Sequence, residues 1–268
     1  MIKDKNGKGW KVVALTPAGR KRHLEILKKY IEKSSFIDGW QLWVNTGNGD
    51  DINYMNEIAD NKIELKRIEG LNKQDNFSIC KFFQYANNED TIYIRFDDDI
   101  VFIEDNAIEN LLKARLDNPE PFVVFANIVN NALISNIHQR IGALGMEMGE
   151  AQRDRFAHLN HRNPEFAKFI HNNFVEKYKN GKLEEYVFPN ETISDYNTFS
   201  INCFAFFGGD MKKIPERDEE FWISQKRRKE LKRPNMICGN ALVVHYAFFP
   251  QRNELDSGTD LLNFYKNL

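Results

Sequence analysis

The chain has 268 residues, of which 42% are hydrophobic and 13% aromatic, so it is long enough to bury a substantial core. Its 37 Lys and Arg nearly balance its 39 Asp and Glu, and the net charge of -2 excludes a general attraction to nucleic acid or to an anionic membrane. The three cysteines (Cys80, Cys203 and Cys238) are odd in number and lack metal-site spacing, which indicates free thiols in a reducing compartment.

The first ten residues, MIKDKNGKGW, are polar and lack the apolar stretch of a signal peptide. No run approaches the ~18 to 20 apolar residues that a membrane-spanning helix needs. We therefore expect a cytoplasmic protein with no transmembrane segment.

Strands and helices alternate through the first half of the sequence. Apolar runs rich in β-branched residues predict strands over 10–16, 40–45, 62–68, 91–96 and 121–128. Helical periodicity predicts helices over about 20–33, 51–60, 76–86 and 105–116. This alternation is typical of an α/β fold with a largely parallel sheet, in which ligands bind beyond the carboxyl ends of the strands.

The second half is less regular. Residues 129–200 consist mostly of polar helical or loop segments, and the runs 200–207 and 241–249 predict strands. Neither an internal repeat nor a low-complexity linker divides the chain, so we expect a single domain over residues 1–268.

The predicted strand 91–96 runs directly into Asp97, Asp98 and Asp99, and an apolar run follows at once. Adjacent carboxylates at the edge of a core need a counter-charge, and Mn²⁺ or Mg²⁺ supplies it because these ions prefer oxygen ligands. Because residues i and i+2 of an extended segment point the same way, Asp97 and Asp99 would share a site while Asp98 faces elsewhere. The alternative is a solvated turn, although core residues do not usually flank such a turn on both sides.

The arrangement strand–DDD–apolar resembles the DxD motif of GT-A-fold, metal-dependent nucleotide-sugar glycosyltransferases. The resemblance extends to the segment VVALTPAGRKRH, to an acidic motif near Glu219 and to a late histidine, from about residue 10 to 252. It implies a GT-A (Rossmann-like) fold, with a mixed, largely parallel α/β sheet flanked by helices. It also implies a nucleotide-sugar-binding half over about 10–128 and an acceptor-binding half over about 129–268.

The resemblance assigns roles around a metal that bridges the two phosphates of the donor. Asp97 would contact the ribose or a metal-bound water, and Asp99 would ligate the metal. His245 would be a third ligand, although a histidine within an apolar strand is equally well explained as a core residue. The donor would be a nucleoside-diphosphate sugar, and a UDP-sugar is expected because such donors are common among these enzymes.

In the same enzymes the nucleobase and ribose lie at the end of the first strand. Gly19 would let the ligand approach the backbone, and Arg20 would reach a phosphate or a base edge. An ordinary strand-to-helix turn explains this segment as well. The candidates for donor contacts are Thr16, Pro17, Ala18, Gly19, Arg20, Asn45 with its neighbour Thr46, Lys81, Arg95, Asp97 and Asp98.

A second acidic group comprises Asp218, Glu219 and Glu220. In inverting members of the family a carboxylate at about this place deprotonates the acceptor hydroxyl, so we expect Glu220 or Glu219 as the base and Asp218 as the third choice. Trp222 would stack on an acceptor ring. The alternative is the first turn of a helix, where acidic residues are favoured by the dipole.

The acceptor is less clear from the sequence. A basic run over 226–233 is explained by a solvated face, by a loop closing on the diphosphate, or by a polyanionic acceptor. Residues Gln251 and Arg252 would close over the donor phosphates. We expect a carbohydrate or lipid-linked saccharide acceptor, with DNA carrying hydroxymethylated bases, as in phage-type enzymes, as an alternative.

Two other function classes fit parts of the pattern. A sugar nucleotidyltransferase also places carboxylates and a metal at the edge of an α/β sheet, but its Gly-rich basic loop is represented only by TPAGRKR. A non-catalytic binding module would leave the Asp97–Asp99 run without a task.

Overall fold

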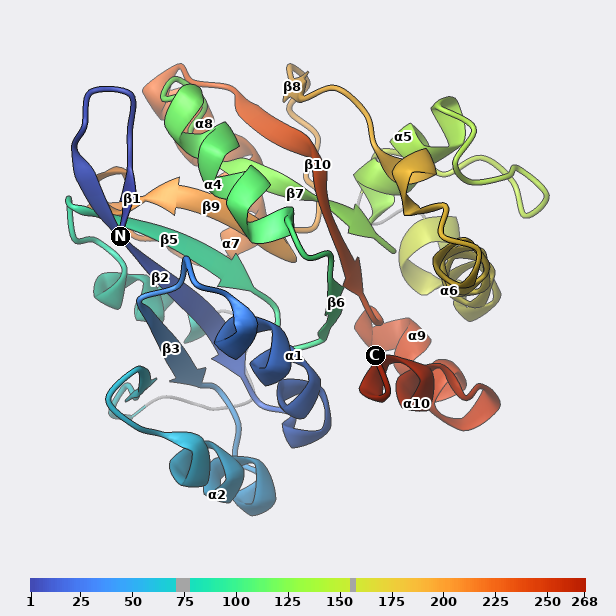
Figure 1. Cartoon of the computed structure of the whole chain (residues 1–268), viewed down its shortest axis with the longest axis horizontal. Helices are drawn as coiled ribbons and strands as arrows, with labels where there is room; N and C mark the ends of the chain where they lie inside the picture. Colours follow the sequence, from blue (N-terminus) through green and yellow to red (C-terminus); the bar gives the residue numbers. More distant parts are fainter. Residues whose placement is uncertain (71–77, 155–157) are drawn as a thin grey trace.

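The computed structural model describes residues 1–70, 78–154 and 158–268. In these residues one sheet has the strand order β4-β3-β2-β5-β9-β7-β10-β6, while β1 pairs with β2 and β8 pairs with β10 (Figure 1). The strands are β1 (Ile2–Lys3), β2 (Gly9–Ala18), β3 (Gly39–Val44), β4 (Ile63–Lys66), β5 (Thr91–Phe96), β6 (Ile100–Ile103), β7 (Val124–Val129), β8 (Glu191–Ile193), β9 (Cys203–Phe207) and β10 (Asn235–His245).

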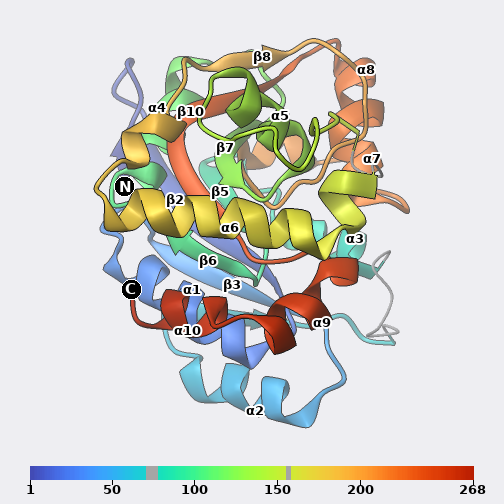
Figure 2. The ribbon, with the colours of Figure 1, turned by 90° about the vertical axis from the view of Figure 1, so that its right-hand side faces the viewer.

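Helices cover both faces of this sheet. Two π-helical turns, at His158–Arg162 and Trp222–Lys226, accompany the α-helices. Helices α6, α9 and α10 lie on one side of the sheet (Figure 2) and bury a second apolar cluster against β6 and β10. The helices are α1 (Lys21–Lys33), α2 (Gly49–Ile58), α3 (Ile79–Phe82), α4 (Ala107–Asp117), α5 (Ala132–Arg140), α6 (Pro164–Lys179), α7 (Glu219–Phe221), α8 (Arg227–Leu231), α9 (Phe249–Gly258) and α10 (Leu261–Lys266).

Most strands that follow a helix point in the same direction. Strands β2, β3, β4 and β5 are mutually parallel, and β7 is parallel to β10. Because β9 is antiparallel to both β5 and β7, these two groups also run parallel to each other. The expected mixed, largely parallel α/β sheet flanked by helices is confirmed. No helix of the described residues is long and apolar enough to cross a membrane.

The strand directions bring distant parts of the chain to one edge of the sheet. Strands β5, β7 and β10 end at this edge, whereas the antiparallel strands β6 and β9 begin there. The residues after Phe96, after Val129, before Cys203 and at His245 must therefore lie near one another. In open α/β sheets this carboxyl edge is where ligands bind.

Several element boundaries differ from those predicted. Strand β2 continues through Pro17 to Ala18, because beyond Leu15 it pairs only with β3 and a proline can occupy such a half-paired position. The predicted helix 76–86 becomes α3 and a 3-10 turn at Phe83–Tyr85, and its first two residues lie outside the described residues.

Strand β10 begins at Asn235, six residues earlier than expected. It continues through an irregularity at Gly239, so the residues on both sides of this glycine belong to one strand. Its register with β7 shifts between Ile237 and Leu242. A Cβ atom at Gly239 would lie 1.9 Å from the carbonyl oxygen of Phe188, so only glycine fits this close approach. The Cys-Gly-Asn segment, which precedes the predicted strand 241–249, is an irregularity inside β10.

Candidate active site

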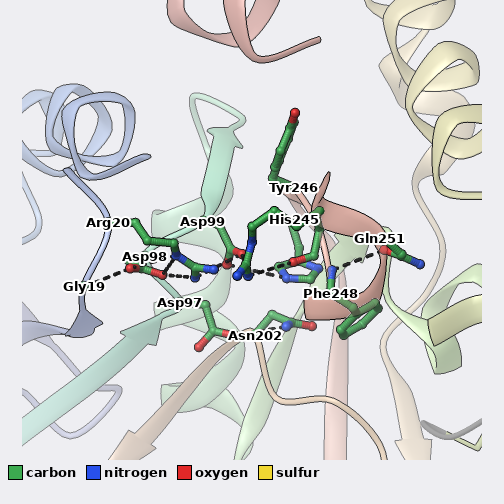
Figure 3. Close-up of polar contacts among 12 residues, drawn as sticks. Gly19, Arg20, Asp97, Asp98, Asp99, Asn202, His245, Tyr246, Phe248 and Gln251 are labelled. Carbon is green, nitrogen blue, oxygen red and sulfur yellow. Dashed lines mark hydrogen bonds and ion pairs between the residues drawn. The ribbon is translucent and has the colours of Figure 1, made fainter. Parts of the chain in front are cut away.

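Two acidic side chains and a histidine meet at the carboxyl edge of the sheet. Asp97 and Asp99 lie in the short connection between β5 and β6, and His245 ends β10, where it pairs with Ile100. One ligand atom from each of the three side chains lies within 4.8 Å of the others (Figure 3). Segments that are almost 150 residues apart in the sequence thus form one cluster.

The orientation of His245 suits a metal ligand. Its Nδ1 lies 3.0 Å from the carbonyl oxygen of Asn130 and must donate to it, since a carbonyl oxygen only accepts. Nε2 is therefore unprotonated in the neutral ring, and it lies 3.5 Å from Asp99 Oδ1. Two carboxylates and one imidazole nitrogen form a donor set that fits Mn²⁺ and, less well, Mg²⁺.

Arginines already neutralise much of the acidic run. Asp98 accepts from the backbone N–H of Gly19 at 3.0 Å and forms a close ion pair with Arg20. Arg20 also lies 3.1 Å from Asp99, and Arg252 of α9 lies 3.4 Å from Asp99. Long side chains from distant elements therefore supply part of the counter-charge that the sequence analysis assigned to a divalent cation, and the cation itself stays a prediction.

The same neighbours determine the ionisation of Asp99, which is 2% exposed. Burial disfavours its charged form, but the guanidinium of Arg20, with a smaller contribution from Arg252, holds the pKa of Asp99 below its usual value. Asp99 is thus a carboxylate near neutral pH and is ready to bind a cation.

Arg95 connects the acidic run to Glu219. Its guanidinium lies 2.8 Å from Asp97 and 2.8 Å from Glu219 Oε1. Glu219 Oε2 is buried and has no hydrogen-bond partner among the described residues. Burial is the main cause that raises the pKa of Glu219 to about 7, against the opposing effect of Arg95. This places the carboxyl in the range expected of a general base or acid.

The predicted donor-contact residues near the first strand separate into two groups. Thr16, Pro17 and Ala18 belong to β2 and are buried, and the Thr16 hydroxyl accepts from Trp40 Nε1 at 2.9 Å. Gly19 and Arg20 are partly exposed at the strand end. A Cβ atom at Gly19 would lie 3.3 Å from the Cβ of Thr46, so the ends of β2 and β3 approach closely, as expected.

Four other candidates (Asn45, Lys81, Asp218 and Glu220) differ in their local contacts or exposure. Asn45 accepts from the hydroxyl of Ser78 at 3.0 Å, and Lys81 is exposed on α3. Asp218 caps α7 by accepting from Phe221 N at 3.0 Å, and its neighbour Glu220 is half-buried. These assignments stay predictions.

Two expectations from the sequence are wrong. Trp222 is 1% exposed and packs against Phe122 in the core, so it cannot stack on an acceptor. Gln251 is fully buried and donates to Asn160 O at 2.9 Å, so it cannot close over phosphates. In both cases an adjacent residue is more exposed: Phe221 is 44% exposed, and Arg252 is partly exposed with its guanidinium 3.4 Å from Asp99.

Sequence reasoning missed three asparagines around the cluster. Asn202 donates to Asp97 Oδ2 at 3.0 Å, and Asn131 in turn donates to Asn202 Oδ1 at 2.9 Å. Asn130 contacts His245 through its carbonyl group. The available signal was their position: Asn130 and Asn131 follow the predicted strand 121–128 within three residues, and Asn202 lies near the start of the predicted strand 200–207.

Comparisons with known proteins concern the fold. No family model and no curated protein sequence matches the chain. Among solved structures, CMP:2-keto-3-deoxy-manno-octonic acid synthetase complexed with CTP matches 96% of this chain and 100% of its own, with 10% identity and a TM-score of 0.50. An inositol-1-phosphate CTP transferase from T. maritima matches 96% of this chain and 97% of its own, with 13% identity and a TM-score of 0.49.

At this level of identity the match to the synthetase shows the fold alone. The chain has a Rossmann-like, mixed α/β fold that it shares, over nearly its whole length, with a protein whose structure contains CTP. Neither of the two similar proteins is named as a glycosyltransferase.

Proposed function

We propose that the chain is a metal-dependent glycosyltransferase that moves a sugar from a nucleoside-diphosphate sugar to an acceptor hydroxyl. The observation that carries this proposal is the convergence of Asp97, Asp99 and His245 at the carboxyl edge of the sheet, with Glu219 tied to Asp97 through Arg95. A bound Mn²⁺ or Mg²⁺ would neutralise the charge that develops on the departing diphosphate.

Different residues would bind the cation, pair with the diphosphate and accept the proton. Asp97, Asp99 and His245 would hold the cation, while Arg20 and Arg252 lie beside Asp99 and would pair with the diphosphate. Glu219 would take the proton of the acceptor hydroxyl as its oxygen bonds to the anomeric carbon. The bond between that carbon and the phosphate oxygen breaks, and the nucleoside diphosphate leaves with the electron pair.

The basic run offers little support for a nucleic-acid acceptor. Lys226 pairs with Glu216 at 2.5 Å and Arg227 with Glu230 at 3.2 Å. Arg228 is 2% exposed and donates to the carbonyl of Ile193. These three side chains already have partners within the protein, which argues against a polyanionic acceptor. The proposed acceptor is therefore a carbohydrate or a lipid-linked saccharide.

The overall fold favours a second candidate, a sugar nucleotidyltransferase. A synthetase complexed with CTP matches 96% of this chain with a TM-score of 0.50. Beside the cluster, a hollow of about 390 Å³ is lined by Arg20, Lys21 and Arg22 together with Glu25, Asn48, Asp50 and Asp51. In this reaction a sugar oxygen would attack the α-phosphorus of a nucleoside triphosphate held there, and pyrophosphate would leave.

The leaving group distinguishes the two candidates. We would incubate the protein and Mn²⁺ with UDP-, GDP- and CMP-sugars, and separately with CTP or UTP plus a panel of sugars and sugar phosphates. Nucleotide-sugar cleavage, including slow transfer to water, that Asp99→Asn abolishes is expected for the glycosyltransferase. Pyrophosphate release from one triphosphate would instead support the nucleotidyltransferase, and no turnover in either series would contradict both.

A further inference from the structure

Two consecutive asparagines, the Asn130–Asn131 pair, connect β7 to α5 next to the metal-ligand cluster. They are 1% and 2% exposed. Asn130 has φ of +60°, a left-handed conformation that few residues other than glycine adopt easily, asparagine among them. A buried pair of polar residues with one in such a conformation indicates that these positions are used for specific contacts.

Asn130 holds the histidine side of the cluster. Its carbonyl oxygen accepts from His245 Nδ1 at 3.0 Å, and its side-chain Nδ2 donates to Tyr246 O at 3.0 Å. The N–H of Tyr246 in turn donates to the carbonyl of Asp99 at 2.8 Å. The left-handed turn thus fixes the ring orientation and tautomer of His245, so that Nε2 faces Asp99.

Asn131 holds the opposite side through a relay. Its Nδ2 donates to Asn202 Oδ1 at 2.9 Å, which orients the Asn202 amide so that Nδ2 donates to Asp97 Oδ2 at 3.0 Å. The N–H of Asp97 also donates to the Asn202 carbonyl at 2.8 Å. Asn131 Oδ1 separately accepts from Ile134 N and caps α5.

We infer that the Asn130–Asn131 pair is a positioning element that sets the divalent-cation affinity of the Asp97, Asp99 and His245 cluster. The inference rests on the proposed function, because it requires that this cluster binds a cation. Each residue of the pair acts on a different ligand, and neither touches the cation site itself. Outer-shell partners of this kind typically change metal affinity by ~10- to 100-fold when removed.

The experiment measures the dissociation constant of Mn²⁺ by electron paramagnetic resonance, without nucleotide. Asn131→Asp retains a cap for α5 but loses the Nδ2 donor, Asn131→Ala loses both, and Asn202→Ala removes the second link. We expect each to weaken Mn²⁺ binding by ~10- to 100-fold. The double variant Asn131→Ala/Asn202→Ala should be no weaker than Asn202→Ala, because the two residues act in series.

Asn127→Ala is the matched control. Asn127 is also fully buried: it donates to the carbonyl oxygens of Tyr186 and Gly239 at 2.9 Å each, and its Oδ1 lies 2.7 Å from His138 Nε2. None of these hydrogen-bond partners belongs to the cluster of Asp97, Asp99 and His245. It should lower the melting temperature and leave the Mn²⁺ dissociation constant unchanged. An unchanged constant in all three positioning variants, or an equal loss in Asn127→Ala, would overturn the inference alone. Absence of Mn²⁺ binding in the wild-type protein would overturn the proposed cation site together with the inference.

Discussion

At the residue scale, the burial of Glu219 should make the free energy of unfolding depend on pH. Burial raises its pKa from 4.5 to about 7 in the folded protein. The folded state therefore binds a proton that the unfolded chain has already released between these values, and the free energy of unfolding falls as pH rises through this range. Urea denaturation at pH 5 and pH 8 measures the difference in the free energy of unfolding between the two pH values. We expect this difference to be smaller in Glu219→Gln than in the wild-type protein by up to about 3 kcal/mol.

The same variant tests the role of Glu219 as a base. The wild-type kcat/KM should rise with pH and level off above about 7, whereas Glu219→Gln should lose ~10²- to 10⁴-fold in kcat. Glu220→Gln is the control, since Glu220 is neighbouring but less buried. A larger loss of kcat in Glu220→Gln than in Glu219→Gln would show that Glu220, and not Glu219, accepts the proton.

The sequence could predict those residues of the candidate site that lie together in one local pattern, but not the contacts between distant segments. Alternation in an extended segment placed Asp97 and Asp99 on one side and Asp98 on the other, and the structure agrees, with Asp98 facing Gly19 and Arg20. The hydrogen bond from Asn202 to Asp97 spans 105 positions, and the pairing of Arg20 with Asp98 spans 78. No local pattern contains such contacts. Whether the cluster holds a cation stays a prediction.

At the element scale, α9 brings a competing cation to the site. Its Arg252 lies 3.4 Å from Asp99, and the helix is also linked to α1 through Arg22 and Asp256 at 2.6 Å. Arg252→Ala should therefore tighten Mn²⁺ binding by ~2- to 5-fold in the absence of nucleotide, because one partner of Asp99 is lost. The same variant should weaken nucleoside-diphosphate binding by roughly tenfold or more, because a charged donor to phosphate is lost.

Titration calorimetry measures both affinities. Arg22→Ala is the control for the Mn²⁺ affinity, because it breaks the link between α1 and α9 without removing a partner of Asp99. Parallel losses of Mn²⁺ and nucleotide in Arg252→Ala would contradict the competition and make Arg252 a simple structural contact.

Element prediction was most accurate where a strand is buried along its whole length. Strand β5 was predicted with its observed bounds because all six of its residues are buried between β2 and β9. Prediction was poorest where tertiary contacts override local signals: Pro17 extends β2 past the expected turn, and Gly239 lies within β10 because Phe188 packs against its backbone. The short strand β8 carries too few residues to show a periodicity.

At the scale of the whole molecule, the alternation of strands and helices was enough to predict the α/β class, but the reaction depends on details that the fold does not determine. The same architecture serves a synthetase complexed with CTP. For the proposed transferase, the transferred group would therefore be decided by which ligand the carboxyl edge accepts, and not by the sheet itself.

The distribution of charge predicts the absence of DNA binding. The net charge is -2, and Arg233 of the basic run pairs with Asp210 at 2.5 Å. Because phosphate contacts dominate DNA affinity, we expect no shift of a duplex containing hydroxymethylated cytosine at micromolar protein and ~150 mM salt. A salt-sensitive change in the mobility of the duplex that is lost in Lys229→Ala/Lys232→Ala would contradict this expectation and support DNA as the acceptor.

The most direct test of the central claim is the melting temperature with a panel of nucleotides and nucleotide sugars, with and without Mn²⁺, for the wild-type protein and Asp99→Asn. A ligand at 100 times its dissociation constant adds ~2.7 kcal/mol to the stability of the folded state. The account predicts that one nucleotide stabilises the wild-type protein only when Mn²⁺ is present and that Asp99→Asn abolishes this effect. Stabilisation that is independent of Mn²⁺, or that Asp99→Asn retains, would show that the cluster of Asp97, Asp99 and His245 is not a metal site for nucleotide binding.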